Sequence, residues 1–309
     1  MNTHDIYEAF SKAFDIVKII KTDDYLCEAQ KMGKKVPHET YQTMVVVGLA
    51  YPMRVIKHTK THLVPSFYTF GQDYHHVLKQ RIINSMKDMP YAYKMGVDNH
   101  QHDERLAAVV SGLGYFAKNQ LIITKSFGSY VFLGVVFIDA AFLEATTLDV
   151  LDDCGDCRIC INACPTNALS DEGFNVDLCM SHYNQAKTVL TELQMSSNYS
   201  LFGCDICQMV CPKNVKKGTI VHPEFALSGK EMVSIVDIFA SSEKTFMETY
   251  KNMAYLWKGK TMLMRNACML LYRHQNKTYI PLIKQTLSKP YPSWYLETAK
   301  KVIKDLESI

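Results

Sequence analysis

Two short cysteine runs constrain the fold of this chain more than any other feature of its sequence. The first run, CGDCRICINACP, spaces its cysteines as C-x2-C-x2-C-x3-C-P, and a second run, CDICQMVCP, begins fifty residues later. This spacing wraps a [4Fe–4S] cluster, and the fourth cysteine of a run serves a second cluster. Because each iron takes a thiolate as its outer ligand, the pattern predicts a protein that transfers single electrons.

The two runs predict the ligands of both clusters, because in a two-cluster arrangement they exchange their last cysteines. One cluster would be held by Cys154, Cys157, Cys160 and Cys211, and the other by Cys164, Cys204, Cys207 and one further thiolate. A full second copy of the motif would place that ligand at position 201, where the chain has Leu201. Cys179 is the remaining cysteine nearby, and we expect it to complete the set.

Zinc is the main alternative for the cysteines, because it also binds four thiolates. However, paired zinc knuckles rarely use a third cysteine at this spacing or a proline after the last ligand. Disulfides are disfavoured, because residues 1–20 do not resemble a signal peptide and cytosolic thiols stay reduced. Cys268 lies outside the pattern in an apolar helical stretch and is expected to be a core residue.

Length and composition suggest a cytoplasmic protein of two or three domains. The chain has 309 residues, of which 48% are hydrophobic, so it can bury large cores. Its longest apolar run, 130–143, contains Asp139 and is too short to span a bilayer. We therefore expect a soluble protein without a membrane partner.

The net charge of +3 conceals a basic C-terminal tail. Residues 251–309 carry eleven Lys and Arg against three acids, a net charge of +8. A tail of this kind fits a polyanionic partner such as nucleic acid, and a lysine-rich solvated helical surface explains it equally well. On the first interpretation, RNA phosphates would be met by Lys251, Lys258, Lys260, Arg265, Arg273 and the lysines beyond.

Hydrophobic periodicity predicts helices mixed with non-adjacent strands in the N-terminal half. Helices are expected at 4–20, 73–87 and 102–113, and strands at 43–52, 121–124 and 130–139, with a turn around Gly128. The first helix would place Ile6, Phe10, Ala13, Val17 and Ile20 on one face. This pattern indicates an α/β or α+β domain over 1–150.

The remainder of the chain divides into a loop-rich cysteine domain, 151–225, and an all-helical tail, 226–309. In the tail, helices are expected at 230–250, 261–274, 279–289 and 293–308. Short helices of this length resemble a piece of a helical-repeat solenoid.

Motifs on both sides of the cysteine runs carry a resemblance to a known family. They are GLAYP at 48–52, GQDYHHVL at 71–78, a VD pair at Val97–Asp98, ERLAAVVSGLGYFAKN at 104–119, FGSYVFLG at 127–134, CPTNAL at 164–169 and FGCDICQMVCPKN at 202–214. In this order and spacing, over about 40–300, they resemble the epoxyqueuosine reductases. These are cobalamin-dependent iron–sulfur enzymes that complete queuosine at the wobble position of tRNA.

The resemblance implies a three-part α+β protein. Residues 1–150 would form a nitroreductase-like cobalamin-binding domain similar to that of reductive dehalogenases. Residues 151–225 would form a ferredoxin-like domain with two [4Fe–4S] clusters, and 226–309 a short HEAT-like domain that holds the anticodon stem-loop. The chain departs from the family at Tyr115-Phe116-Ala117, where a Gly-Trp pair and a further Gly are usual, and at Lys213, where Trp is common. We expect a monomer that receives electrons from a one-electron donor such as flavodoxin or ferredoxin.

The resemblance also implies site residues. Asp98 matches the family's acid and would protonate the epoxide oxygen, with a pKa raised by desolvation beside the corrin. The alternative for Asp98 is the N-cap of the helix at 102–113. Arg105 aligns with an arginine that contacts the corrin, and its alternative is a surface ion pair.

Further contacts to the corrin are implied for Ile122 and Leu133, for which ordinary core packing is the alternative, and for Ser181, which would meet corrin or substrate. The stretch from Asp98 to Asp103 partly matches a D-x-H-x-x-G motif whose histidine ligates cobalt, but Asp103 replaces the glycine. We therefore expect His100 and His102 to be polar surface residues near the mouth of the pocket.

Two alternative functions remain open from the sequence. One is an iron–sulfur electron carrier without a substrate of its own, and the other is a zinc-stabilised RNA-binding protein without catalysis.

Overall fold

The computed structural model describes residues 3–141 and 154–309, which form two compact units. Each unit is assembled from three separate segments of the chain. The first unit comprises Met1–Met53, Tyr74–Cys157 and Cys211–Pro223, and the second comprises Arg54–Asp73, Arg158–Val210 and Glu224–Ile309. The chain combines helices with short strands, so the predicted mixture of the two is confirmed.

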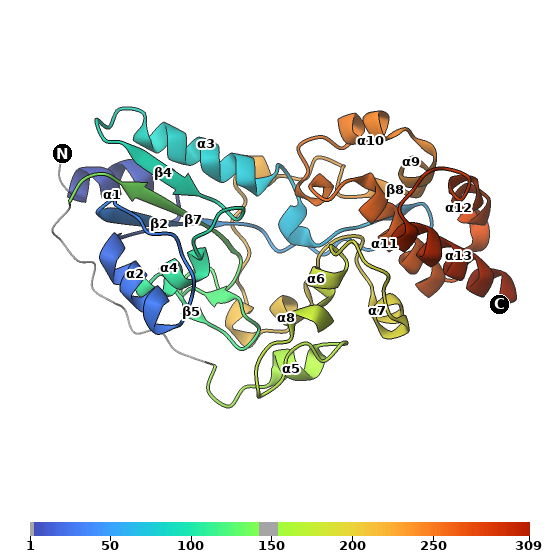
Figure 1. The fold of residues 1–309 in the computed structure, drawn as a ribbon. Helices are drawn as coiled ribbons and strands as arrows, with labels where there is room; N and C mark the ends of the chain where they lie inside the picture. Colours follow the sequence, from blue (N-terminus) through green and yellow to red (C-terminus); the bar gives the residue numbers. More distant parts are fainter. Residues whose placement is uncertain (1–2, 142–153) are drawn as a thin grey trace. The chain divides into compact units, whose positions relative to one another are not determined.

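A four-stranded antiparallel sheet with the order β1-β2-β7-β4 forms the centre of the first unit (Figure 1). Its strands are β1 (Ile16–Lys21), β2 (Thr43–Ala50), β7 (Val131–Ile138) and β4 (Tyr93–Gly96). β2 and β7 pair along their whole length, from Thr43 opposite Ile138 to Ala50 opposite Val131. All of β2 is buried. This burial explains its continuous apolar sequence, which is typical of a strand covered on both faces.

Helices cover both faces of this sheet (Figure 1). They are α1 (Thr3–Ser11) and α3 (Tyr74–Met86) on one face, and α2 (Thr22–Lys31) and α4 (Glu104–Val110) on the other. Tyr25 of α2 and Leu106 of α4 belong to one buried core with Met44 and Phe137 of the sheet. Successive residues of a strand point to opposite faces, so neighbouring Val45 faces the other helix pair.

The helix expected at 4–20 ends at Ser11, and a strand follows it. Ile6 and Phe10 are the buried residues of α1, one turn apart, as predicted. Val17 and Ile20 instead lie in β1, which pairs antiparallel with β2. The sequence IVKII is rich in β-branched residues, whose restricted side chains favour a strand.

The predicted turn around Gly128 is present and anchors the segment that carries Cys211. The strand expected at 121–124 is the short β6 (Ile122–Ile123), which pairs with β5 (Tyr115–Phe116). Gly128 has a φ of +59°, and a Cβ there would collide with the Asn214 side chain. Asn214 lies in a 3-10 helix, Pro212–Asn214, and its side chain accepts from the Ser129 N–H and donates to the Ser129 hydroxyl, both at 2.8 Å. These bonds fix the loop after Cys211 against the start of β7.

The second unit is mostly helical. Its helices are α5 (Ile159–Ala163), α6 (Met180–Tyr183), α7 (Glu192–Ser197), α8 (Ile206–Met209), α9 (Ile235–Ala240), α10 (Glu243–Thr249), α11 (Lys260–Arg273), α12 (Ile280–Thr286) and α13 (Ser293–Ser308), with a two-stranded pair of β3 (His62–Leu63) and β8 (Val233–Ser234). Short 3-10 helices connect them at Phe67–Thr69, Val176–Leu178, Pro223–Phe225, Ala254–Leu256 and Lys277–Tyr279.

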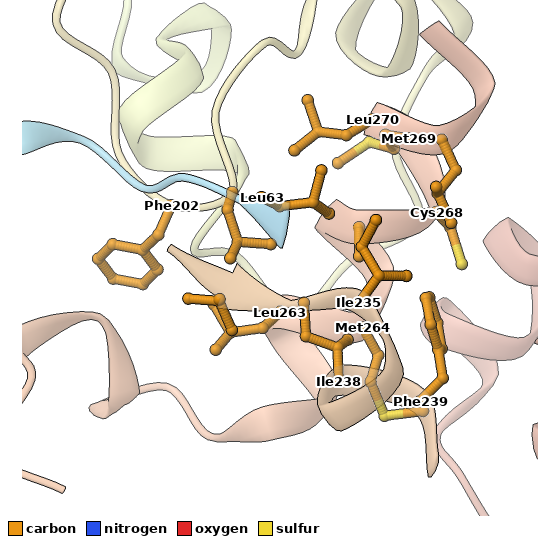
Figure 2. Close-up of a cluster of buried hydrophobic side chains, with 14 of the residues drawn as sticks. Leu63, Phe202, Ile235, Ile238, Phe239, Leu263, Met264, Cys268, Met269 and Leu270 are labelled. Carbon is orange, nitrogen blue, oxygen red and sulfur yellow. The ribbon is translucent and has the colours of Figure 1, made fainter. Parts of the chain in front are cut away.

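The core of the second unit surrounds α11 (Figure 2). Leu263, Met264 and Leu270 of this helix are completely buried beside Ile238 of α9. Cys268 is also completely buried in this core, which confirms the prediction for it.

The helix expected at 230–250 is in fact a short strand and two helices. Ser234 ends β8 and caps α9, and its hydroxyl accepts the Asp237 N–H at 3.3 Å. Ser242 caps α10 in the same way and accepts the Thr245 N–H at 3.0 Å. Serine side chains compete with the helical backbone for hydrogen bonds, which is why they mark these starts. Within the described residues, no helix is long and apolar enough to cross a membrane.

Candidate functional site

Two cysteines of the first unit belong to a small apolar cluster. Cys154 and Cys211 pack together with Ala117 and Ile123. Cys157 follows on a turn in which its N–H bonds to the Cys154 carbonyl at 3.0 Å. Both Cys154 and Cys157 interact electrostatically with Cys211. The unit thus gathers three of the four thiols predicted for one cluster.

Lys118 supports the turn that carries Cys154 and Cys157. Its Nζ donates to the carbonyl oxygens of Gly155 at 2.7 Å and of Cys157 at 3.1 Å. Its backbone N–H points to the Cys154 sulfur at 3.5 Å. Such donors and a nearby positive charge stabilise thiolate ligands. In the sequence Lys118 is part of the motif at 104–119, and no pattern of neighbouring residues indicated its contact with the cysteine turn.

The second unit brings together Cys164, Cys179, Cys204 and Cys207, here called the second cysteine group. The thiol of Cys207 interacts electrostatically with the other three and with Cys160. Cys160, Cys164 and Cys207 also lie in one apolar cluster. Cys179 therefore lies among the thiols of the two runs, although it belongs to neither run.

Burial and backbone donors set the protonation of these thiols in opposite directions. Burial raises the pKa of Cys179, and it raises that of Cys204 to about 12 despite a bond from the Ile206 N–H. Burial opposes ionisation of Cys164 as well, but the N–H and hydroxyl of Thr166 help to hold its pKa below the ordinary value. Iron bound here would supply the positive charge that lets the buried thiols ionise, with release of their protons.

Two tyrosines lie beside the second cysteine group. The Tyr199 hydroxyl donates to the Cys204 sulfur at 3.6 Å and accepts the Asp205 N–H at 2.6 Å. The Tyr183 hydroxyl is buried and has no hydrogen-bond partner among the described residues. Burial, followed by the charges of neighbouring cysteines such as Cys204, raises the pKa of both phenols. Both therefore keep their protons at neutral pH.

These features fit a [4Fe–4S] cluster in the second cysteine group. The donor set consists of thiols alone, which suits iron–sulfur chemistry. Buried polar atoms are almost always hydrogen-bonded, and an occupant that carries sulfur acceptors would offer the isolated Tyr183 hydroxyl a partner. Across 3–141 and 154–309, no group of His, Cys, Asp or Glu side chains is spaced to hold a single metal ion.

Asp98 does not cap the helix that follows it. α4 begins at Glu104, and its cap is Asp103, whose carboxylate accepts the N–H groups of Arg105 and Leu106 at 3.0 Å. The capping alternative for Asp98 is therefore wrong. Asp98 lies five residues before Asp103 in a polar stretch, so the sequence alone did not distinguish the two acids as caps.

The loop that carries Asp98 is held by several polar contacts. Asp98 has a left-handed backbone with φ of +59°, and its N–H donates to the Glu104 carboxylate. That carboxylate also lies 2.9 Å from His100 Nε2. The Asp98 carboxylate lies 2.9 Å from His75 Nε2 of α3, and its side chain is 51% exposed. An acid on an anchored loop, accessible and paired with an imidazole, is suited to proton transfer.

The other residues predicted at the cofactor have different environments. Arg105 is exposed, and its guanidinium donates to the Gln120 carbonyl at 3.2 Å. Ile122 is buried in the core beneath α2 and α4, and Leu133 is partly buried against the same core. Core packing accounts for both. Ser181 is half-buried in α6 of the second unit.

An open hollow of about 540 Å³ in the first unit is lined by both Asp98 and Arg105. His102 also lines it, and its Nδ1 is buried without a hydrogen-bond partner among the described residues. Burial lowers the pKa of His102. His102 lies at the hollow, as expected for a residue near the mouth of a pocket. Neither histidine is fully exposed, however, because both are half-buried and His102 packs on Phe137 with ring centroids 4.5 Å apart.

The basic C-terminal tail is only partly available to a polyanion. Lys260 and Arg265 are buried, with 1% and 0% exposure. Lys260 donates to the Ser241 carbonyl, and Arg265 donates to backbone carbonyls of the same unit. The expectation that these two residues meet RNA phosphates is therefore wrong. Lys300 and Lys304 of α13, by contrast, are exposed.

A protein-family model described as a 4Fe-4S double cluster binding domain matches residues 153–214. The matched range contains both cysteine runs and Cys179. The match supports iron–sulfur clusters as the occupants of the cysteine groups and disfavours zinc.

Comparison with known proteins finds similarity over most of the chain. It is 29% identical over 300 residues to the epoxyqueuosine reductase of Lactococcus garvieae (strain Lg2), covering 90% of this chain and 82% of the relative. It is 33% identical over 270 residues to that of Listeria monocytogenes serovar 1/2a, covering 81% and 69%. A crystal structure of epoxyqueuosine reductase with a tRNA-Tyr epoxyqueuosine-modified stem loop superposes with a TM-score of 0.84 at 26% identity, covering 98% of this chain and 89% of that one. The chain belongs to the epoxyqueuosine reductase family.

Proposed function

We propose that this chain reduces epoxyqueuosine to queuosine at the wobble position of tRNA. The observation that carries the proposal is membership of a family named for this reaction, in a chain that gathers the thiols for electron transfer. A crystal structure of a related reductase holds an epoxyqueuosine-modified tRNA stem loop, which supports tRNA as the substrate.

Two [4Fe–4S] clusters are proposed to carry the electrons. Their ligands would be Cys154, Cys157, Cys160 and Cys211 for one cluster, and the second cysteine group for the other. Clusters of this type pass one electron at a time. An external one-electron donor, of the flavodoxin or ferredoxin class, would therefore have to deliver two electrons for each epoxide.

Cobalamin is proposed to bind at the hollow in the first unit. The exposed Arg105 guanidinium on its lining fits the amide-bearing edge of a corrin, which offers carbonyl acceptors. When bound, cobalamin would supply low-potential electrons or a nucleophilic metal centre. The protein's contribution is to orient the substrate, exclude water and provide protons.

Asp98 is proposed as the proton donor. Conversion of an epoxide to an alkene consumes two electrons and two protons and releases the oxygen as water. Asp98 would protonate that oxygen, and His75, whose Nε2 lies 2.9 Å away, would supply the next proton to the carboxylate. The bond from the Asp98 N–H to Glu104 holds the loop while the carboxyl group acts.

The C-terminal helices, 226–309, are proposed to contribute to tRNA binding as a HEAT-like domain of a monomeric, three-domain enzyme. Lys300 and Lys304 lie one turn apart on the exposed surface of α13, where they can meet phosphate groups. Phosphate contacts of this kind position a substrate without selecting its sequence.

The test is turnover by the full chain after anaerobic reconstitution with iron, sulfide and cobalamin. A tRNA stem-loop bearing epoxyqueuosine is incubated with a low-potential reductant, and the nucleoside is analysed by mass spectrometry for loss of one oxygen atom. Conversion to queuosine is expected. Absence of conversion, with iron and cobalamin both bound at full stoichiometry, would contradict the proposed reaction.

Asp98→Asn tests the role of the acid in the same assay. Turnover should fall by roughly 10²–10⁴-fold, the usual contribution of general acid catalysis, while iron and cobalamin contents stay at the wild-type level. Asp139→Asn is the matched control, since Asp139 is also an exposed acid of the first unit. Equal turnover by Asp98→Asn and Asp139→Asn would remove Asp98 from the mechanism.

A further inference from the structure

Tyr199 is positioned to donate a hydrogen bond to a sulfur atom of the second cysteine group. The Asp205 N–H already donates to the phenol oxygen at 2.6 Å, so the hydroxyl proton must point elsewhere. The Cys204 sulfur lies 3.6 Å from that oxygen, within the range of a bond to sulfur. The geometry therefore makes Tyr199 a donor and the Cys204 sulfur its acceptor.

Tyr183 approaches the same group from a different element. It lies at the end of α6, four residues after Cys179, and its side chain is 2% exposed. Its hydroxyl interacts electrostatically with Cys164, Cys179 and Cys204 but has no hydrogen-bond partner in the part of the chain that the structure describes.

The backbone around Tyr183 is held by two hydrogen bonds. The carbonyl oxygen of Tyr183 accepts a bond from the buried Arg265 guanidinium at 3.0 Å, and the next residue, Asn184, is held by its own side-chain bond to the Gly203 carbonyl at 2.9 Å. These bonds hold the backbone segment that carries the Tyr183 side chain. A buried hydroxyl without a partner is unfavourable, and a cluster with sulfur acceptors would offer it one.

We propose that Tyr183 and Tyr199 donate hydrogen bonds to the sulfur atoms of the cluster held by the second cysteine group, and that these bonds raise its reduction potential. The inference rests on the proposed function, in which this group holds a [4Fe–4S] cluster. Reduction adds one electron to the cluster and breaks no bond. Hydrogen bonds to the sulfurs stabilise the more negative, reduced form, and they are a recognised determinant of cluster potential. The two tyrosines would thus act on electron transfer through the reduction potential of the cluster.

The experiment is a potentiometric titration of the reconstituted full chain, followed by electron paramagnetic resonance of the reduced clusters. The variants are Tyr199→Phe, Tyr183→Phe and the double variant. Each single change should shift the midpoint of one cluster to a more negative potential, the double change should shift it further, and the other cluster should not move. Tyr255→Phe is the matched control, because Tyr255 is a buried tyrosine of the same unit whose hydroxyl donates to the Lys230 carbonyl and not to a thiol.

Tyr183→Phe decides the outcome if Tyr199→Phe disturbs folding through the lost Asp205 bond. Its hydroxyl has no partner among the described residues, so its removal breaks no protein contact. An unchanged midpoint in Tyr183→Phe with full iron and sulfide content overturns the assignment of Tyr183 as a donor, and with it the proposal. Wild-type protein that takes up no iron would instead contradict the proposed function, so the two failures are distinguishable.

Discussion

Replacing Arg265 by methionine tests whether this buried cation stabilises the second unit or serves RNA binding. Arg265 is fully buried in α11, and burial lowers its pKa to about 10, so it is charged at neutral pH. Its guanidinium donates at 2.6–3.1 Å to three backbone carbonyl oxygens, those of Tyr183, Ala186 and Thr188. It also lies 5.4 Å from the Trp294 ring centroid. No part of it is available to a phosphate.

The expected loss of stability follows from these contacts. In Arg265→Met the carbonyls lose their partner, at about 1–3 kcal/mol for each buried acceptor left unsatisfied. Removal of the buried charge recovers part of its desolvation penalty, so a net loss of roughly 3–5 kcal/mol in the free energy of unfolding is expected. At about 2–4 °C per kcal/mol for a unit of this size, Tm should fall by on the order of 10 °C.

The assay is thermal unfolding of the reconstituted full chain by circular dichroism, alongside stem-loop affinity at several salt concentrations. Arg273→Met is the matched control, because Arg273 lies on the same helix but is exposed, and surface changes of this kind usually stay within about 0.5 kcal/mol. For Arg265→Met the salt dependence of binding should equal that of wild type. A Tm as high as that of Arg273→Met, combined with a flatter salt dependence, would refute the structural role.

Three further changes test separate features. Cys179→Ala should lose about half of the iron and sulfide while Cys27→Ala, at an exposed cysteine, loses none; full iron in Cys179→Ala would mean that another residue supplies the ligand. Asp103→Ala should lower the free energy of unfolding by about 1 kcal/mol through loss of the α4 cap. Because the folded state holds the pKa of Asp103 below its ordinary value, that loss should appear in full at neutral pH, begin to shrink near about pH 4 and disappear only in stronger acid, below the lowered pKa. A pH-independent difference would contradict the assignment. Exchange of Lys300 and Lys304 for glutamine should flatten the plot of log affinity against log salt by roughly 0.7–0.9 per lost phosphate contact, and an unchanged slope would exclude this face of α13.

Elements with one dominant signal were predictable from the sequence. The apolar run of β2 and the long amphipathic α13 agree with the expected ranges to within about two residues. The elements that were missed have weak signals. α2 buries little besides Tyr25 and Ala29 in a polar sequence, and β4 is an edge strand of four residues, Tyr93–Gly96, too short to give a clear pattern. Their positions depend on the sheet and its helices, which local patterns do not encode.

The site residues were predictable where their spacing in the sequence identifies a known ligand motif, and they were less predictable elsewhere. Cys179 could be named because the motif left one ligand open, and the structure places it among the other thiols. Tyr183 and Tyr199 carry no such spacing signal, since their role depends on how separate turns meet. Arg265 was expected to meet phosphates because it contributes to the net charge of the tail, and only the tertiary structure reveals the carbonyls that hold it.

The alternation of the chain between its two units has a consequence for synthesis on the ribosome. β3 emerges early but pairs with β8, whose residues follow some 170 positions later. Likewise, the carbonyl oxygens of Tyr183, Ala186 and Thr188 gain their hydrogen-bond donor only when Arg265 has been synthesised. Because a chain emerges from its N-terminus and domains fold as units, the second unit cannot close around its cysteines until almost the whole chain has been made. Iron delivered before that point would meet a site that has not yet folded, so the cluster of this unit must be inserted after synthesis is nearly complete.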